Sequence, residues 1–261
     1  MVVDNLTHMV TTVCTLKCKY CATLIPAFRD AGKAVHYPLD NLMSEIALIF
    51  KIYSRVDNFR PQGGESFLHP QIREILIGLN QYSQQFGRII LVTNGTYALR
   101  TAVVDTLHNL KYDYLVRIDD YGKHSIKLNE LLRQCDENHI KYEVCHYNEK
   151  EQYFGGWLDL SLSDTPVTGS LTERFTRCKN RYSCKTIQDG KLWGCGIAAS
   201  AAIIERFKSN DDDYVDLTGA LPIDEMVNQT MKLGEKPFSV CAYCEGYDPE
   251  NGRRIPAAEQ L

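Results

Sequence analysis

Strand-like and helical segments alternate over the first 146 residues of this 261-residue chain, and this alternation constrains the fold more than any other feature. Each strand-like segment is short and is followed by apolar residues that recur at helical spacing. Such a pattern favours an α/β fold, in which parallel strands are joined by helices through right-handed connections. The predicted strands are residues 6–13, 58–62, 88–92, 114–118 and 141–146.

The helical periodicity fades from about residue 150 onward. Up to that point it is regular: Leu128, Leu131, Leu132 and Cys135 lie at i, i+3, i+4 and i+7, which places Cys135 in the core. We predict a first domain over residues 1–160 and a second over residues 161–261. Cys145 is also assigned to the core.

The charge balance argues against a polyanionic partner. The chain has 29 basic and 33 acidic residues, and no basic stripe interleaved with aromatic residues is present. The first ten residues do not resemble a signal peptide, and no run of eighteen apolar residues occurs. We therefore expect a cytoplasmic protein that binds neither nucleic acid nor membrane.

A diglycine followed by glutamate stands at the end of the second predicted strand. Gly63 and Gly64 would let the backbone approach a ligand closely, and the carboxylate of Glu65 could accept hydrogen bonds from an ammonium group. In a parallel sheet, the carboxyl ends of the strands form the binding edge. This motif is thus a candidate binding loop.

Two later strands also end in polar residues. Thr93 and Asn94 could contact a ribose or a carboxylate, or could simply form the turn before Gly95. Arg117 and Asp119 are two residues apart on one strand, so they share a face and could reach the same ligand. The convergence of all these strand ends is a stronger argument than any one of them.

Ten cysteines occur in the chain, and most are grouped at spacings typical of metal ligands rather than of a disulfide framework. Cys14, Cys18 and Cys21 form a C-x3-C-x2-C trio directly after the first predicted strand. Three thiolates would leave one position of a four-iron cluster free. Zinc is the alternative for both this trio and the later set, which comprises Cys178, Cys184, Cys195, Cys241 and Cys244.

The trio segment CTLKCKYC, residues 14–21, resembles the signature of the radical S-adenosylmethionine (SAM) superfamily. The resemblance implies a partial (β/α)6 TIM-like barrel with a small C-terminal auxiliary-cluster domain, built from a β-hairpin and a helix. It also implies a [4Fe-4S] cluster whose free iron is chelated by the methionine end of SAM. The residues implied in cofactor binding are Tyr20, Gly63, Gly64, Glu65, Thr93, Asn94, Arg117 and Asp119.

The later cysteines resemble the auxiliary-cluster appendage called a twitch domain, which is related to the longer SPASM domain. Asp189-Gly190 predicts a two-residue hairpin turn that places Cys195 on the returning strand. We predict one auxiliary [4Fe-4S] cluster. Its ligands would be Cys178, Cys195, Cys241 and Cys244. A competing reading pairs Cys178 with Cys184, as in SPASM proteins, and frees one of the last two cysteines.

The resemblance implies that SAM is cleaved to a 5′-deoxyadenosyl radical, with electrons from an external reductant such as flavodoxin or ferredoxin. We expect hydrogen abstraction from a carbinol carbon of a small sugar or cyclitol-like substrate. Epimerisation is preferred over oxidation because Cys184, if free, could return a hydrogen atom, although a spare cysteine could equally be a buried core residue. The alternatives are a peptide-modifying maturase and a non-enzymatic iron-sulfur electron carrier. Tyr153, Trp157 and Asp159 are candidates for the substrate pocket.

Overall fold

The computed structural model describes residues 1–148, 157–160, 162–183 and 185–261, and in these residues eight strands form one sheet. The strand order is β5-β4-β3-β2-β1-β6-β7-β8. The strands from β1 to β6 pair in parallel, which confirms the predicted α/β fold, and β7 and β8 pair antiparallel. The strands are β1 (Val2–Thr11), β2 (Arg55–Gly63), β3 (Phe86–Thr93), β4 (Tyr114–Asp120), β5 (Tyr142–His146), β6 (Lys185–Gln188), β7 (Lys191–Trp193) and β8 (Tyr214–Asp216).

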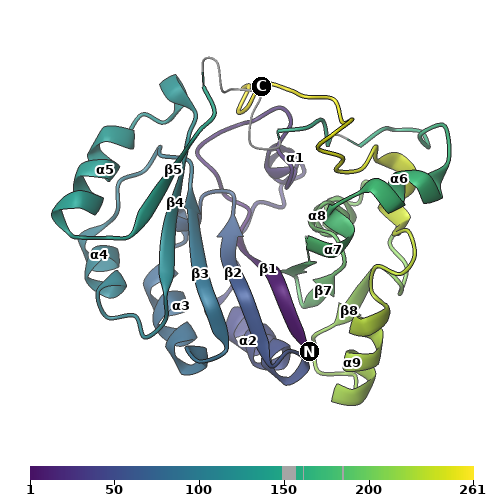
Figure 1. The fold of residues 1–261 in the computed structure, drawn as a ribbon, viewed down its shortest axis with the longest axis horizontal. Coiled ribbons are helices and arrows are strands. Elements are labelled where there is room, and N and C mark those ends of the chain that lie inside the picture. The colour runs from purple at the N-terminus through teal and green to yellow at the C-terminus, as the bar shows by residue number, and fades with distance from the viewer. Residues whose placement is uncertain (149–156, 161, 184) are drawn as a thin grey trace.

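The helices between residues 39 and 137 lie on the outer, convex side of the curved sheet (Figure 1). Their amphipathic faces supply the core against the strands, as the periodicity predicts. The helices are α1 (Ile25–Asp30), α2 (Leu39–Ile52), α3 (Ile72–Leu79), α4 (Thr101–Leu107), α5 (Leu128–Glu137), α6 (Leu171–Arg177), α7 (Asn180–Ser183), α8 (Gly196–Ile203) and α9 (Ile223–Lys232).

The strands alternate between apolar and polar residues because their two faces have different surroundings. On β2, Phe59 and Pro61 are buried, whereas Arg60 and Gln62, which point to the opposite, concave side, are less buried. A parallel sheet that is covered on both faces would carry nearly continuous apolar strands. The polar concave side therefore identifies the face that is left for a ligand.

The hairpin predicted at Asp189-Gly190 is confirmed: β6 and β7 pair antiparallel around this turn, and both turn residues have positive φ. A buried link holds the hairpin to the first half. Glu45 on α2 contacts His8 Nε2 of β1 at 2.6 Å and accepts a hydrogen bond from the Gly190 N–H at 2.6 Å. The domain division near residue 160 stays a prediction. Strands from before and after this residue belong to the same sheet.

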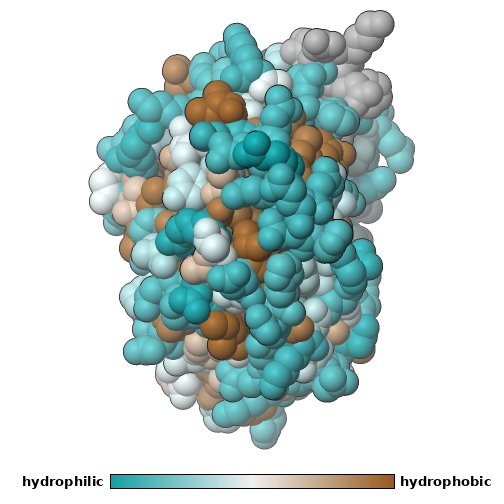
Figure 2. Space-filling view, turned by 90° about the vertical axis from the view of Figure 1, so that its left-hand side faces the viewer, coloured by the Kyte–Doolittle hydropathy of each residue, from teal (hydrophilic) through white to brown (hydrophobic). Residues whose placement is uncertain are grey.

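The surface on the side of α4 and α5 is mainly hydrophilic, and hydrophobic side chains are scattered over it (Figure 2). Ile77 and Ile126 are among the exposed hydrophobic residues. Isolated side chains of this kind are normal on a folded protein. Among the described residues, the helices are all too short or too polar to cross a lipid bilayer.

Candidate functional site

The carboxyl ends of β1 to β4 meet at a pocket of about 250 Å³. The pocket brings together the cysteine trio and all but one of the predicted cofactor-binding residues, Glu65 being the exception. Those among its lining residues are Cys14, Cys18, Tyr20, Cys21, Gly63, Gly64, Thr93, Asn94, Arg117 and Asp119. Four separate segments of sequence thus contribute to one cavity, as the strand-end argument predicts.

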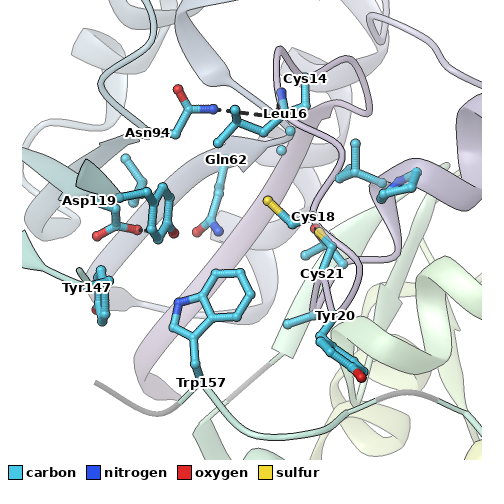
Figure 3. Close-up of a pocket in the computed structure, with 18 of the residues that line it drawn as sticks. Cys14, Leu16, Cys18, Tyr20, Cys21, Gln62, Asn94, Asp119, Tyr147 and Trp157 are labelled. Carbon is cyan, nitrogen blue, oxygen red and sulfur yellow. Dashed lines mark hydrogen bonds between the residues drawn. The ribbon is translucent and has the colours of Figure 1, made fainter. Parts of the chain in front are cut away.

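The cysteine loop and the β4–β5 edge face each other across the pocket (Figure 3). Cys18 and Cys21 lie on one side, and Asp119 and Tyr147 lie on the other. Trp157 lies between these two sides, at the bottom of the view. A ligand in this pocket would contact the sulfur groups and the polar wall at the same time.

Gly63 and Gly64 are required by close backbone packing. A Cβ on Gly63 would lie 1.9 Å from the Thr11 carbonyl oxygen, and one on Gly64 would lie 2.3 Å from the Val13 carbonyl oxygen. The Gly64 N–H donates to Thr11 O at 3.0 Å, which fixes this approach. The diglycine therefore positions the start of the cysteine loop, in addition to lining the pocket.

The structure places Glu65 outside the pocket lining. Its carboxylate is fully buried and accepts hydrogen bonds from the Thr93 hydroxyl (3.0 Å), the Asn94 N–H (2.9 Å) and the Phe67 N–H (3.3 Å). All of these partners belong to the protein. Glu65 joins the ends of β2 and β3, and the pocket surface at this motif is formed by the two glycines. The contact of Glu65 with an ammonium group stays a prediction, and the contacts described here are those within the chain.

Glu65 should make the stability of the protein depend on pH. Burial raises the pKa of Glu65 from an ordinary 4.5 to about 7, against the opposing effect of its three hydrogen bonds. The folded state then holds a proton that the unfolded state loses between pH 4.5 and 7, so stability falls as pH rises through this range. Between pH 4.5 and 7, we expect the free energy of unfolding of the wild type to fall by up to about 3 kcal/mol relative to that of Glu65→Gln.

Differential scanning calorimetry of both proteins across this pH range measures the effect, because contributions from other titrating groups cancel in the comparison. A difference between the two melting temperatures that stays constant with pH would show that Glu65 is already ionised at pH 5.

Asn94 connects the end of β3 to the cysteine loop. Its side-chain Nδ2 donates to Cys14 Sγ at 3.5 Å and to Thr15 Oγ1 at 3.1 Å. Its Oδ1 accepts from the Thr96 N–H at 3.0 Å, a local turn contact. Asn94 therefore makes the turn contact that the sequence left open, and its contact with a ribose or carboxylate stays a prediction.

Arg117 and Asp119 do share one face of β4, and they form an ion pair with Arg117 Nε donating to Asp119 Oδ1 at 2.9 Å. Arg117 also donates to the Tyr147 hydroxyl at 2.5 Å, and the Tyr121 hydroxyl donates to Asp119 Oδ2 at 3.4 Å. The ring of Trp157 packs edge-on against Tyr121. The wall opposite the cysteines is thus a connected polar network with aromatic faces beside it.

The sulfurs of the trio are surrounded by hydrogen-bonding groups. Cys14 Sγ accepts from the Leu16 N–H at 3.4 Å as well as from Asn94, and Cys21 Sγ lies 3.3 Å from the Thr23 hydroxyl. Burial raises the pKa of Cys14 to about 11 and that of Cys18 to about 12. Donors aimed at sulfur fit thiolates, and a bound cationic cluster would supply the charge that makes these buried thiols ionise.

A second cavity gathers the later cysteines. Cys178, Cys195, Cys241 and Cys244 all line it. Cys178 Sγ accepts from the Tyr247 N–H at 3.2 Å, and Cys244 Sγ accepts from the Gly246 N–H at 3.3 Å. These are the four cysteines of the preferred, twitch-like ligand set.

Cys195 stands at the N-terminus of α8, where the helix dipole favours a thiolate. Among the described residues, no group of three or more His, Cys, Asp or Glu side chains fits a single metal ion. Zinc would draw its thiolates to about 2.3 Å from one point, whereas a four-iron cluster carries one thiolate on each iron.

Two predicted residues, Cys184 and Tyr153, lie outside the described residues. Cys135 is fully buried, as predicted. Cys145 is a correction: it lies on β5 opposite Asp119 and is partly exposed, because β5 is an edge strand. Asp159 pairs with Arg253 and is not among the pocket-lining residues.

Several pocket residues were not predicted. Gln62 immediately precedes the diglycine, and Tyr147 follows the last residue of β5. Tyr121 was not named as a site residue either, although residues 119–122, with the sequence DDYG, form a candidate motif at the end of the fourth predicted strand. Each lies at the carboxyl end of a strand, so a systematic reading of strand ends could have found them. Gln260 Nε2 lies 3.5 Å from Cys18 Sγ, and no local sequence pattern points to this contact across 242 residues.

No family model matches the chain, and no curated protein matches it by sequence. Among solved structures, the chain is similar to the crystal structure of Streptococcus suis SuiB bound to S-adenosylmethionine, with a TM-score of 0.47 and 15% sequence identity. The alignment covers 94% of this chain and 72% of the SuiB chain. A likeness of this size says nothing about shared chemistry. The functional assignment therefore rests on the residues of the site.

Proposed function

We propose that this chain is a radical SAM enzyme that carries a [4Fe-4S] cluster on Cys14, Cys18 and Cys21. The observation that supports this most is the single pocket in which the trio meets the ends of β2, β3 and β4. A separate iron-sulfur electron carrier would have no need of such a pocket. The donors around the sulfurs and the diglycine packing fit a loop built to hold a cluster.

When bound, the cluster and SAM supply the radical that removes a hydrogen atom from the substrate. The chain's own residues hold and orient the reactants. Gly63 and Gly64 offer backbone close to the trio, and Asn94 offers an amide to the sulfur and to the loop. The apolar residues Leu158 and Leu160 are buried beside the pocket and help to exclude water.

We propose a small polyhydroxylated substrate such as a sugar or cyclitol. Gln62 and Tyr147 can exchange hydrogen bonds with hydroxyl groups, and the faces of Tyr121 and Trp157 offer apolar contact to ring C–H groups. Epimerisation is preferred over oxidation on the sequence argument from Cys184. The four cysteines of the second cavity support an auxiliary [4Fe-4S] cluster.

Anaerobic reduction of the reconstituted protein with SAM tests the proposal directly. We expect a brown protein that releases 5′-deoxyadenosine and methionine when dithionite or reduced flavodoxin is supplied. A colourless, zinc-loaded protein, or a brown protein that releases no 5′-deoxyadenosine, would contradict the assignment.

Turnover of candidate sugars in deuterated water separates epimerisation from oxidation. An epimerase that returns hydrogen from an exchangeable thiol would place one solvent deuteron on carbon, and Cys184→Ala would stall it. A ketone product without deuterium on carbon would favour oxidation instead. Unchanged turnover and stereochemistry in Cys184→Ala would remove this residue from the donor role.

A further inference from the structure

Residues 259–261 pair with the middle of the first cysteine loop, although the two segments are about 240 residues apart in sequence. The Lys19 N–H donates to Glu259 O at 2.7 Å, and the Leu261 N–H donates to Lys17 O at 2.9 Å. Cys18 and Gln260 form an antiparallel bridge between these contacts. The loop that presents Cys18 is therefore held by a short piece of added strand.

The side chain of Gln260 is oriented by its own contacts. Its Oε1 accepts from the Lys17 N–H at 2.7 Å, which identifies the other amide atom as the nitrogen. That Nε2 donates to Ala258 O at 2.6 Å and to Cys18 Sγ at 3.5 Å. An amide N–H is thus directed at the sulfur of a proposed cluster ligand.

The segment that carries Gln260 is fixed along its length. The Asp159 N–H donates to Arg253 O at 2.9 Å, and the Ile255 N–H donates to Trp157 O at 3.2 Å. Ile255 and Ala258 are buried. In Figure 1 the C-terminal trace crosses the top of the molecule above α1. A segment held in this way can keep a hydrogen-bond donor at a constant distance from Cys18.

We propose that Gln260 is a positioning residue that raises the reduction potential of the cluster on Cys14, Cys18 and Cys21. This inference rests on the function proposed above. Reduction adds negative charge to the cluster and its thiolates, and an N–H donor at sulfur stabilises that charge.

Potentiometric titration of the anaerobically reconstituted enzyme, followed by electron paramagnetic resonance (EPR), tests this role. The cluster of interest is recognised by the change in its EPR spectrum when SAM is added. Gln260→Glu and Gln260→Met both remove the N–H donor, and the methionine variant adds no charge. We expect both variants to have a more negative potential than the wild type, with unchanged iron content.

Glu259→Gln is the matched control, because it removes the ion pair with Lys19 and leaves Gln260 in place. Its potential should equal that of the wild type. Unchanged potentials in both Gln260 variants, an equal shift in Glu259→Gln, or loss of iron from both Gln260 variants would overturn the inference. A wild type without a SAM-sensitive EPR signal would instead overturn the proposed function.

Discussion

Cys14→Ala is expected to reduce 5′-deoxyadenosine formation to the level of a metal-free blank. Cys14 is one of three cysteines at the pocket, and its sulfur accepts hydrogen bonds from the Leu16 N–H and from Asn94 Nδ2. Two thiolates cannot hold a cluster that normally takes four ligands. Without the cluster, the iron that would bind SAM is also absent. Liquid chromatography of anaerobic reactions with SAM and dithionite measures the loss.

Cys145→Ala is the matched control for this variant. Cys145 is also a partly exposed cysteine near the carboxyl edge of the sheet, but it is not among the residues that line the pocket. It should form 5′-deoxyadenosine at the wild-type rate. Normal product formation by Cys14→Ala, or its loss in both variants, would contradict the assignment of the trio as the SAM-cluster ligands.

Cys244→Ala is expected to lower the iron and sulfide content by about half while SAM cleavage continues, since each four-iron cluster takes its own set of cysteines. Cys244 lines the second cavity with Cys178, Cys195 and Cys241, and the Gly246 N–H donates to its sulfur. Turnover of the substrate should cease, because the auxiliary cluster would be absent. Iron and sulfide analysis together with a SAM-cleavage assay separate the two effects.

Cys184→Ala distinguishes the two ligand sets. If Cys178, Cys195, Cys241 and Cys244 bind the auxiliary cluster, Cys184→Ala keeps its full iron content. If Cys178 and Cys184 bind it as a pair, Cys184→Ala loses half of the iron and one variant at Cys241 or Cys244 keeps it all. The second result would replace the twitch-like set with the SPASM-like one.

The strand ends could be predicted because they depend on local patterns. Helical spacing located α5, and the residues that follow the predicted strands located the pocket edge at Gly63 and Asn94. Strands of a parallel sheet bring their carboxyl ends together whatever the loops contain. Prediction therefore succeeded wherever a short segment and the rules of a parallel sheet were sufficient.

Contacts between distant segments could not be predicted in this way. The burial of Glu65 depends on donors from Thr93 and Asn94, and the partial exposure of Cys145 depends on β5 being at an edge of the sheet. The contact of Gln260 with Cys18 requires a particular path of the last residues over the molecule. Each outcome is set by tertiary packing, which leaves no periodic mark on the sequence.

The pairing of β1 with β6 determines how the two groups of sulfurs can move. β1 leads to Cys14, and the hairpin that begins with β6 leads to Cys195. Adjacent parallel strands share a ladder of backbone hydrogen bonds, which opens far less readily than a loop. If the two proposed clusters are bound, this ladder would hold them at a nearly constant separation.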